Sequence, residues 1–134
     1  MPTMRLRIAD LDHFVLTVRD LDATVNFYER VLGMRAFTFA DGTRKGLAFG
    51  RHKINLHQVG HEHLPNAREA RPGSADLCFL TDTPLEDVIA HLAEMSVAVE
   101  YGPDAADGAR GRLRSVWLRD PDGNLIELAN RAAE

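Results

Sequence analysis

The feature of this sequence that most constrains its fold is a repeated order of elements. Residues 12–18 read as a strand, because Phe14, Leu16 and Val18 recur at every second position. Residues 75–81 repeat the same alternation, and a helical pattern follows each of these two strands. Three further strands are predicted after each helix, near 34–40, 46–50 and 53–58 in the first half and near 97–101, 113–119 and 124–129 in the second.

The predicted fold class is α+β, with two βαβββ modules forming a curved mixed sheet that encloses a cup-shaped site. The length of 134 residues fits one domain, 1–134. Module one covers about 8–58 and module two about 75–131. Residues 59–74 are polar and contain two prolines, so they are predicted to be the linker between the modules.

Capping signals place the two helices. Asp20 is the expected N-cap of the first helix, which Gly33 ends. Thr83 is the expected N-cap of the second, with Pro84 in its first turn and Glu86 completing a capping box. Each helix is therefore expected to start directly after a strand.

Composition excludes several classes of protein. The net charge is −4 and no dense run of Lys or Arg occurs, which argues against nucleic acid as a partner. No apolar stretch is long enough to cross a membrane, and residues 1–10 lack the apolar core of a secretory signal, so a cytoplasmic location is expected. The single cysteine, Cys78, excludes an internal disulfide framework and a Cys-rich zinc site.

Strand alternation also predicts where the polar side chains point. If the apolar residues pack under the helices, His13, Asn55 and His57 share the opposite face in the first half. Asp76 and Glu127 take that face in the second half. Imidazole nitrogens and carboxylate oxygens suit a divalent cation such as Zn, Ni, Mn or Fe, and three protein ligands leave positions open for water or substrate.

Each of these residues also has an ordinary structural explanation. A histidine early in a strand is usually exposed or hydrogen-bonded, and a glutamate between two apolar residues usually marks the solvent side of an edge strand. The agreement in face across the repeat is what favours His13, His57 and Glu127 as metal ligands.

Two segments resemble the vicinal oxygen chelate superfamily: LDHFVLTVRDLDATVNFYERVLGM and the closing RDPDGNLIEL. This superfamily includes glyoxalase I, extradiol dioxygenases, fosfomycin-resistance thiol transferases and bleomycin-binding proteins. The segments FGRHKINLHQVG, RPGSADLCFLT and GPDAADGARG resemble, more narrowly, the branch of glyoxalase-domain-containing protein 5 and its bacterial virulence-associated relatives. The resemblance covers nearly the whole chain.

The resemblance implies metal ligands on the first and last strands of the modules. His13 and Glu127 match the superfamily pattern, whereas Asn55 stands where glyoxalases have a glutamate and Asp76 where a histidine is usual. The first departure argues against standard glyoxalase I activity. His57 is the predicted third ligand, and Asp76 is a ligand, an orienting group or a general base. The superfamily also implies a homodimer.

The leading functional prediction is a metal-dependent lyase, isomerase, dioxygenase or transferase acting on a small oxygen-rich substrate, chelated through vicinal oxygens. Asp76 is the candidate catalytic base. Asn55, Arg71 and Arg114 are candidate substrate contacts. Residues 102–111, with three glycines, are either a mobile lid or an ordinary hairpin.

Two alternatives stay open at this point. A non-catalytic protein of the bleomycin-resistance type would sequester a drug or metabolite in a wide, aromatic-lined groove. The chain contains only one Trp, two Tyr and six Phe, which favours the metalloenzyme. A structural or regulatory relative whose metal site has decayed is the third possibility, which the Asn55 and Asp76 departures keep open.

Overall fold

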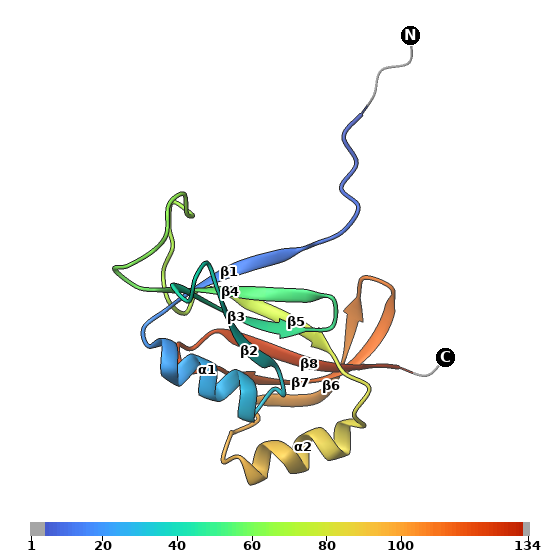
Figure 1. The fold of residues 1–134 in the computed structure, drawn as a ribbon. Coiled ribbons are helices and arrows are strands. Elements are labelled where there is room, and N and C mark those ends of the chain that lie inside the picture. The colour runs from blue at the N-terminus through green and yellow to red at the C-terminus, as the bar shows by residue number, and fades with distance from the viewer. Residues whose placement is uncertain (1–4, 133–134) are drawn as a thin grey trace.

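The computed structural model describes residues 5–132 and confirms the repeat of two βαβββ modules (Figure 1). Module one consists of β1 (His13–Val18), α1 (Leu21–Arg30), β2 (Arg35–Phe39), β3 (Arg44–Phe49) and β4 (His52–Gln58). Module two consists of β5 (Asp76–Leu80), α2 (Leu85–Glu94), β6 (Tyr101–Gly108), β7 (Gly111–Arg119) and β8 (Leu125–Arg131).

Each module forms its own four-stranded mixed sheet. The strand orders are β1-β4-β3-β2 and β5-β8-β7-β6, with the first and last strands of each module parallel and the other pairs antiparallel. Within residues 5–132 no backbone ladder joins the two sheets. The predicted α+β class with two βαβββ modules is confirmed. Each module has its own mixed sheet, with β1 and β5 as edge strands, and the two sheets are not closed into one.

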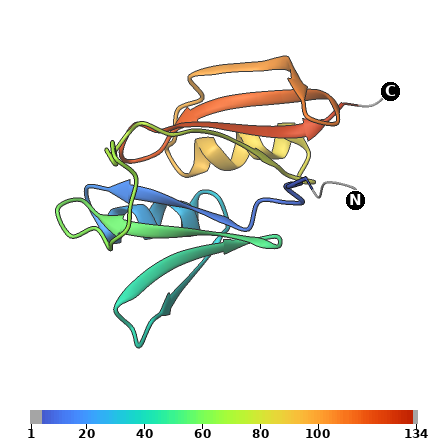
Figure 2. The same ribbon diagram turned by 90° about the horizontal axis from the view of Figure 1, so that it is seen from above.

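The two modules share a hydrophobic core on the helical side of the sheets. Both helices lie beneath the sheets in Figure 1, and Figure 2 shows the modules side by side. Leu77 and Phe79 of β5 pack against the buried residues of both modules. The rings of Phe49 and Phe79 meet edge to face, with centroids 5.2 Å apart. The halves therefore depend on each other for burial of their apolar faces.

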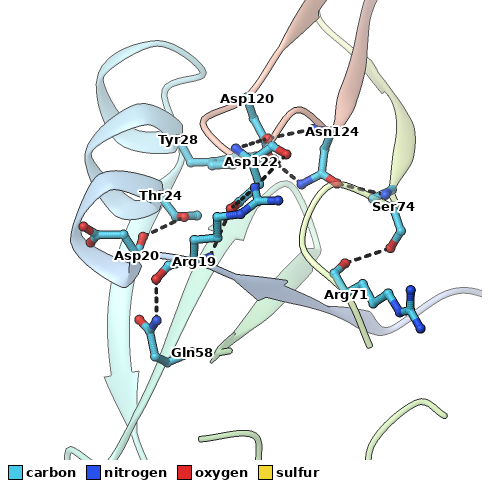
Figure 3. Close-up of polar contacts among 11 residues, drawn as sticks. Arg19, Asp20, Thr24, Tyr28, Gln58, Arg71, Ser74, Asp120, Asp122 and Asn124 are labelled. Carbon is cyan, nitrogen blue, oxygen red and sulfur yellow. Dashed lines mark hydrogen bonds and ion pairs between the residues drawn. The ribbon is translucent and has the colours of Figure 1, made fainter. Parts of the chain in front are cut away.

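A polar joint fixes the turn before β8 to module one (Figure 3). The Asp120 carboxylate accepts hydrogen bonds from the Tyr28 hydroxyl, from the backbone N–H groups of Asp122 and Asn124, and from the Asn124 side chain. Arg19 donates its backbone N–H and a guanidinium N–H to Asp122. Together these bonds satisfy buried polar groups that would otherwise destabilise the core.

The helix ends agree with the sequence at one cap and differ at the other. Asp20 caps α1 by accepting from the Ala23 N–H, as predicted. Pro84, not Thr83, is the N-cap of α2, and no side chain caps that helix. The Thr83 N–H is instead bound by the Thr81 hydroxyl, which turns the chain before the helix starts. Within residues 5–132 no helix is long and apolar enough to span a membrane.

The sixth strand lies later in the chain than the sequence indicates. It was expected near 97–101, but β6 begins at Tyr101 and pairs with β7 as far as the Gly108–Gly111 pair. Residues 102–111 are therefore the strand and turn of a hairpin, which favours the hairpin over the mobile lid.

Candidate functional site

The strand register places the candidate residues on the faces that alternation predicts. In sheet one Val15 is the partner of Asn55, and Thr17 is the partner of His57. Their neighbours Leu16, Ile54 and Leu56 are buried in the core under the helices. His13, Asn55 and His57 therefore share the face that is turned away from the helices.

Sheet two repeats this arrangement. Cys78 is the register partner of Glu127, while Ile126 and Leu128 are buried under α2. Asp76 is two positions before Cys78 and is exposed on the same face. Asp76 and Glu127 are thus on the face of sheet two that is turned away from the helices, as His13 and His57 are in sheet one.

A carboxylate orients His13. Its Nδ1 lies 2.8 Å from Oδ2 of Asp12, and this hydrogen bond is the main reason that the pKa of Asp12 is lowered. A carboxylate only accepts, so Nδ1 carries the hydrogen and Nε2 keeps a free lone pair. The His13 side chain is 41% exposed. A histidine that donates one ring N–H to a carboxylate and keeps its other nitrogen free has the usual arrangement of a metal ligand.

A hydroxyl orients Glu127 in a similar way. The Ser115 hydroxyl donates to Oε2 of Glu127 at 2.6 Å, and Ser115 is fully buried. The pKa of the neighbouring Cys78 thiol is raised to about 11, first by burial and then by the charge of Glu127. Glu127 and Cys78 line a pocket of about 300 Å³ under the β6–β7 hairpin.

His57 has a different environment. It is only 3% exposed, and its Nε2 lies 3.1 Å from Nη2 of Arg44. Since a guanidinium only donates, Nε2 accepts and Nδ1 carries the hydrogen. That Nδ1 is buried and has no hydrogen-bond partner among the described residues. Burial, followed by the charge of Arg44, lowers the pKa of His57, so the neutral ring is favoured.

The structure does not bring the predicted ligands together within one copy. His57 pairs with Thr17, four residues along β1 from His13, which is about 13 Å at roughly 3.3 Å per residue. In the described part of the chain no three His, Cys, Asp or Glu residues lie close enough to hold a metal ion. His13, Asn55 and His57 belong to sheet one, and Asp76 and Glu127 to sheet two.

The two candidate arginines lie in different places. Arg71, in the linker, forms an ion pair with Glu69 at 3.0 Å and lines a pocket that also includes His57. Arg114 is exposed on β7, one position from Ser115, and so it points away from the face that carries Glu127. The register therefore gives no support to a role for Arg114 on that face.

The sequence analysis did not identify three residues that contact the candidate ligands. Asp12 could have been found, because a carboxylate directly before a candidate ligand is visible in the chain. Ser115 and Arg44 could not have been found from the sequence. The contact of Ser115 depends on the register of β7 with β8, and that of Arg44 on the register of β3 with β4.

The chain matches known proteins over nearly its whole length. The model of the Glyoxalase/Bleomycin resistance protein/Dioxygenase superfamily matches residues 10–128. Virulence protein STM3117 of Salmonella typhimurium is 47% identical over 127 residues, covering 95% of this chain and 88% of that protein. Glyoxalase domain-containing protein RDO1 of Mycosarcoma maydis is 47% identical over 126 residues, covering 94% and 70%. A solved integron cassette protein, VCH_CASS1 of V. cholerae, is 50% identical with a TM-score of 0.93, covering 96% and 100%.

Proposed function

The chain belongs to the glyoxalase/bleomycin resistance protein/dioxygenase superfamily, and on that premise we propose that it is a divalent-metal-dependent enzyme. Its substrate in this proposal is a small oxygen-rich molecule that presents two vicinal oxygens to the cation. The observation that carries the proposal is the matched support of two candidate ligands. Asp12 orients His13 and Ser115 orients Glu127, and each ligand keeps a donor atom free.

The donor set fits a borderline divalent ion such as Zn, Ni, Mn or Fe. A variant of the fosfomycin resistance protein FosX from Listeria monocytogenes has been solved with Mn(II) and a dihydroxypropylphosphonic acid; it is 17% identical to this chain with a TM-score of 0.65, a likeness of fold. When bound, the cation would supply Lewis-acid polarisation of substrate oxygens. His57, the third ligand predicted from the sequence, is left out of this proposal, because Arg44 occupies its Nε2 and its strand position is about 13 Å from that of His13.

Asp76 is the proposed general base. Its carboxylate is exposed at the start of β5, on the Glu127 face, where it can accept a proton from a substrate held there. The Asn55 side chain is buried, with its Oδ1 unpartnered among the described residues, and we propose that it binds a substrate hydroxyl or amide. Asn55 in place of a glutamate argues against standard glyoxalase I chemistry.

We also propose that two copies complete the site, with module one of each copy facing module two of the other. Both ligand-bearing sheet faces leave an apolar side chain exposed in one copy: Val15 is 43% exposed and Leu80 is 48% exposed, both beside candidate residues. An isologous dimer would bury these apolar side chains and would bring His13 of one copy toward Glu127 of the other, twice.

Elemental analysis tests the metal. Protein purified without chelators should contain a stoichiometric divalent ion, and His13→Ala and Glu127→Ala should each remove it. Sub-stoichiometric metal in both native and metal-soaked protein would contradict the enzyme proposal. Retention of the metal in either variant would place the site elsewhere.

A mixing experiment tests the pairing of copies. His13→Ala and Glu127→Ala chains, unfolded and refolded together, should regain metal, because one of the two sites in a mixed dimer takes both intact ligands. A site built within one chain would regain none. Refolding each variant alone is the control.

One observation favours a second function, the binding of a drug or metabolite without turnover. The Lys53 ammonium lies 4.4 Å from the ring centroid of Phe39 and 5.9 Å from that of Phe37, on the uncovered face of sheet one. Such an aromatic wall suits a planar ligand. TnmS3, an antibiotic binding protein from Streptomyces sp. CB03234, shares the fold at 24% identity with a TM-score of 0.74. Tight binding of a planar ligand by metal-free protein would favour this function.

A further inference from the structure

The pocket under the β6–β7 hairpin contains more than the proposed metal ligand. Its volume of about 300 Å³ is at the lower end of the range of roughly 300–1,000 Å³ that small-molecule pockets occupy. Glu127 and Cys78 line it, and so do two arginines, Arg110 and Arg131. The metal proposal uses only Glu127, so the basic residues of the pocket are left without a role.

The register of β8 fixes the order of the side chains along the pocket. Glu127 and Arg131 are four positions apart on the same face of β8, which is about 13 Å at roughly 3.3 Å per residue. Between them on that face is Ala129, which contributes only a methyl group. Leu80 of β5 and Leu113 of β7 are the register partners of Ala129 and Arg131, and both leucines line the pocket. The pocket is therefore acidic at one end, apolar in the middle and basic at the other end.

The β6–β7 hairpin brings the second arginine to this face. The helices lie beneath the sheets in Figure 1, whereas the orange hairpin rises on the opposite side. Arg110 is in the turn of the hairpin and lines the pocket. Gly108 allows the hairpin to lie close to β7, because a Cβ at this position would be 2.9 Å from side-chain carbons of Leu113. The hairpin therefore forms a close-fitting wall of the pocket.

The charges of the pocket leave its basic end available to an anion. Within residues 5–132, neither Arg110 nor Arg131 forms an ion pair with a carboxylate. The Asp107 carboxylate also lines the pocket, but the Arg112 guanidinium forms an ion pair with it. Guanidinium groups bind carboxylate and phosphate oxygens with two parallel hydrogen bonds. The basic end of the pocket therefore suits an oxyanion.

We propose that this pocket binds a small substrate with chelating oxygens at one end and an oxyanion, a carboxylate or a phosphonate, at the other. The chelating oxygens lie at Glu127, the apolar chain of the substrate packs on Leu80 and Leu113, and Arg131 and Arg110 bind the oxyanion. This inference rests on the proposed function for the metal at Glu127 and on the pocket alone for the oxyanion.

Chelator-treated protein tests the basic end by itself. Acetate or methylphosphonate should shift the ¹H–¹⁵N NMR signals of the Leu113 and Arg131 backbone amides, and neutral acetamide at equal concentration should not. A preference for acetate identifies a carboxylate end, and a preference for methylphosphonate identifies a phosphonate or phosphate end. Absence of any oxyanion-dependent shift would overturn the inference, whatever the metal content of the untreated protein.

Variants assign the binding to the arginines. Arg131→Gln should weaken oxyanion binding about tenfold or more, Arg110→Gln should weaken it as well, and both should keep the metal content of the parent. Arg114→Gln, on the opposite face of β7, is the matched control and should change neither quantity. An oxyanion affinity of Arg131→Gln equal to that of the parent would overturn the inference.

The ion pair between Asp107 and Arg112 gives a readout that a loss of structure would not reproduce. Asp107→Asn removes a negative charge from the pocket and should strengthen oxyanion binding about twofold. Arg112→Gln leaves that charge without its partner and should weaken binding about twofold. Weakening in both variants would indicate disruption of the hairpin and would contradict recognition by charge.

Metal-loaded protein tests the two ends together. With Zn bound, 2-oxoglutarate should bind more tightly than 2-oxopentanoate, which has the same chelating end and a methyl group in place of the second carboxylate. Arg131→Gln should abolish this difference and leave the affinity for 2-oxopentanoate unchanged. Metal-containing protein that does not distinguish the two acids would contradict this inference and not the proposed function. Oxyanion binding by protein that holds no metal would contradict the proposed function and support the basic end of the pocket.

Discussion

The hydroxyl of Tyr28 donates to Oδ2 of Asp120 at 2.7 Å, across a separation of 92 residues. Tyr28 is fully buried in α1 of module one, and Asp120 lies in the turn that leads into β8 of module two. This bond connects the modules at a point where neither sheet reaches the other. The position of Glu127, which follows the turn in β8, therefore depends on module one as well as on its own sheet.

Tyr28→Phe should lower the free energy of unfolding by about 1–3 kcal/mol, because a buried hydrogen bond to a carboxylate is lost. Asp120 keeps its backbone donors and its bond from Asn124, which limits the loss. Urea unfolding measures the effect. Tyr101→Phe, which removes an exposed hydroxyl, is the control and should stay within about 0.5 kcal/mol of the parent. Equal losses in the two variants would contradict a special role for the joint.

Alkaline pH should destabilise the protein through the same residue. Burial, followed by the charge of Asp120, raises the pKa of Tyr28 above its ordinary value of 10.0. The phenol thus stays protonated in the folded state while the unfolded chain loses the proton above about pH 10. Stability is fully present below pH 10 and falls above it by up to about 1.4 kcal/mol per pH unit. Urea unfolding at pH 9 and at pH 11 should find a smaller decrease in Tyr28→Phe than in the parent.

Asp12→Asn should weaken metal binding by about 10–100-fold without removing it. The amide cannot favour the Nδ1–H form of His13 as the carboxylate does, so the free lone pair on Nε2 is less strongly enforced. Competition with a chromogenic chelator measures the affinity. Asp10→Asn changes a neighbouring carboxylate that does not contact His13 and should bind metal as the parent does. If the two variants bind equally well, Asp12 does not orient the ligand.

Cys78 should react slowly with iodoacetamide at neutral pH. Its pKa of about 11 leaves far less thiolate than an ordinary cysteine of pKa about 8.5. In chelator-treated protein, Glu127→Gln should accelerate labelling, because one cause of the raised pKa is the charge of that carboxylate. Mass spectrometry follows the rate, and Glu62→Gln, in the linker, serves as the charge-matched control. A rate unaffected by Glu127→Gln would mean that burial alone suppresses the thiolate.

The fold was predictable because its signals are local. Alternating apolar residues gave the strands, and Asp20 gave one helix start. The start of β6 could not be predicted, because Gly102 and Pro103 are turn-forming residues. They lie at an irregularity of the strand, between the Tyr101–Trp117 and Asp104–Ser115 pairs with β7. Thr83 is not the cap, because α2 begins one residue later than predicted, at Leu85 directly after Pro84.

The candidate site was predictable only in part. The face of each residue follows from alternation, so His13 and Glu127 could be assigned to the same side of their sheets. The partners of those residues depend on which positions of neighbouring strands are opposite each other. The contact of His57 with Arg44, which decides the tautomer, is of this kind. Whether the modules enclose a cup depends on packing between them, which no strand pattern contains.

The packing of Phe79 against Phe49 has a consequence for how this scaffold changes over evolutionary time. A substitution on the helix-covered side of the sheets must be compatible with the packing of both modules, because the core is common to them. A substitution on the opposite side must be compatible only with its own strand and the neighbouring strands. Mutation can therefore exchange imidazole, amide and carboxylate groups there while selection for folding leaves the shared core unaltered, so that one inherited architecture acquires new chemistry at low risk to its stability.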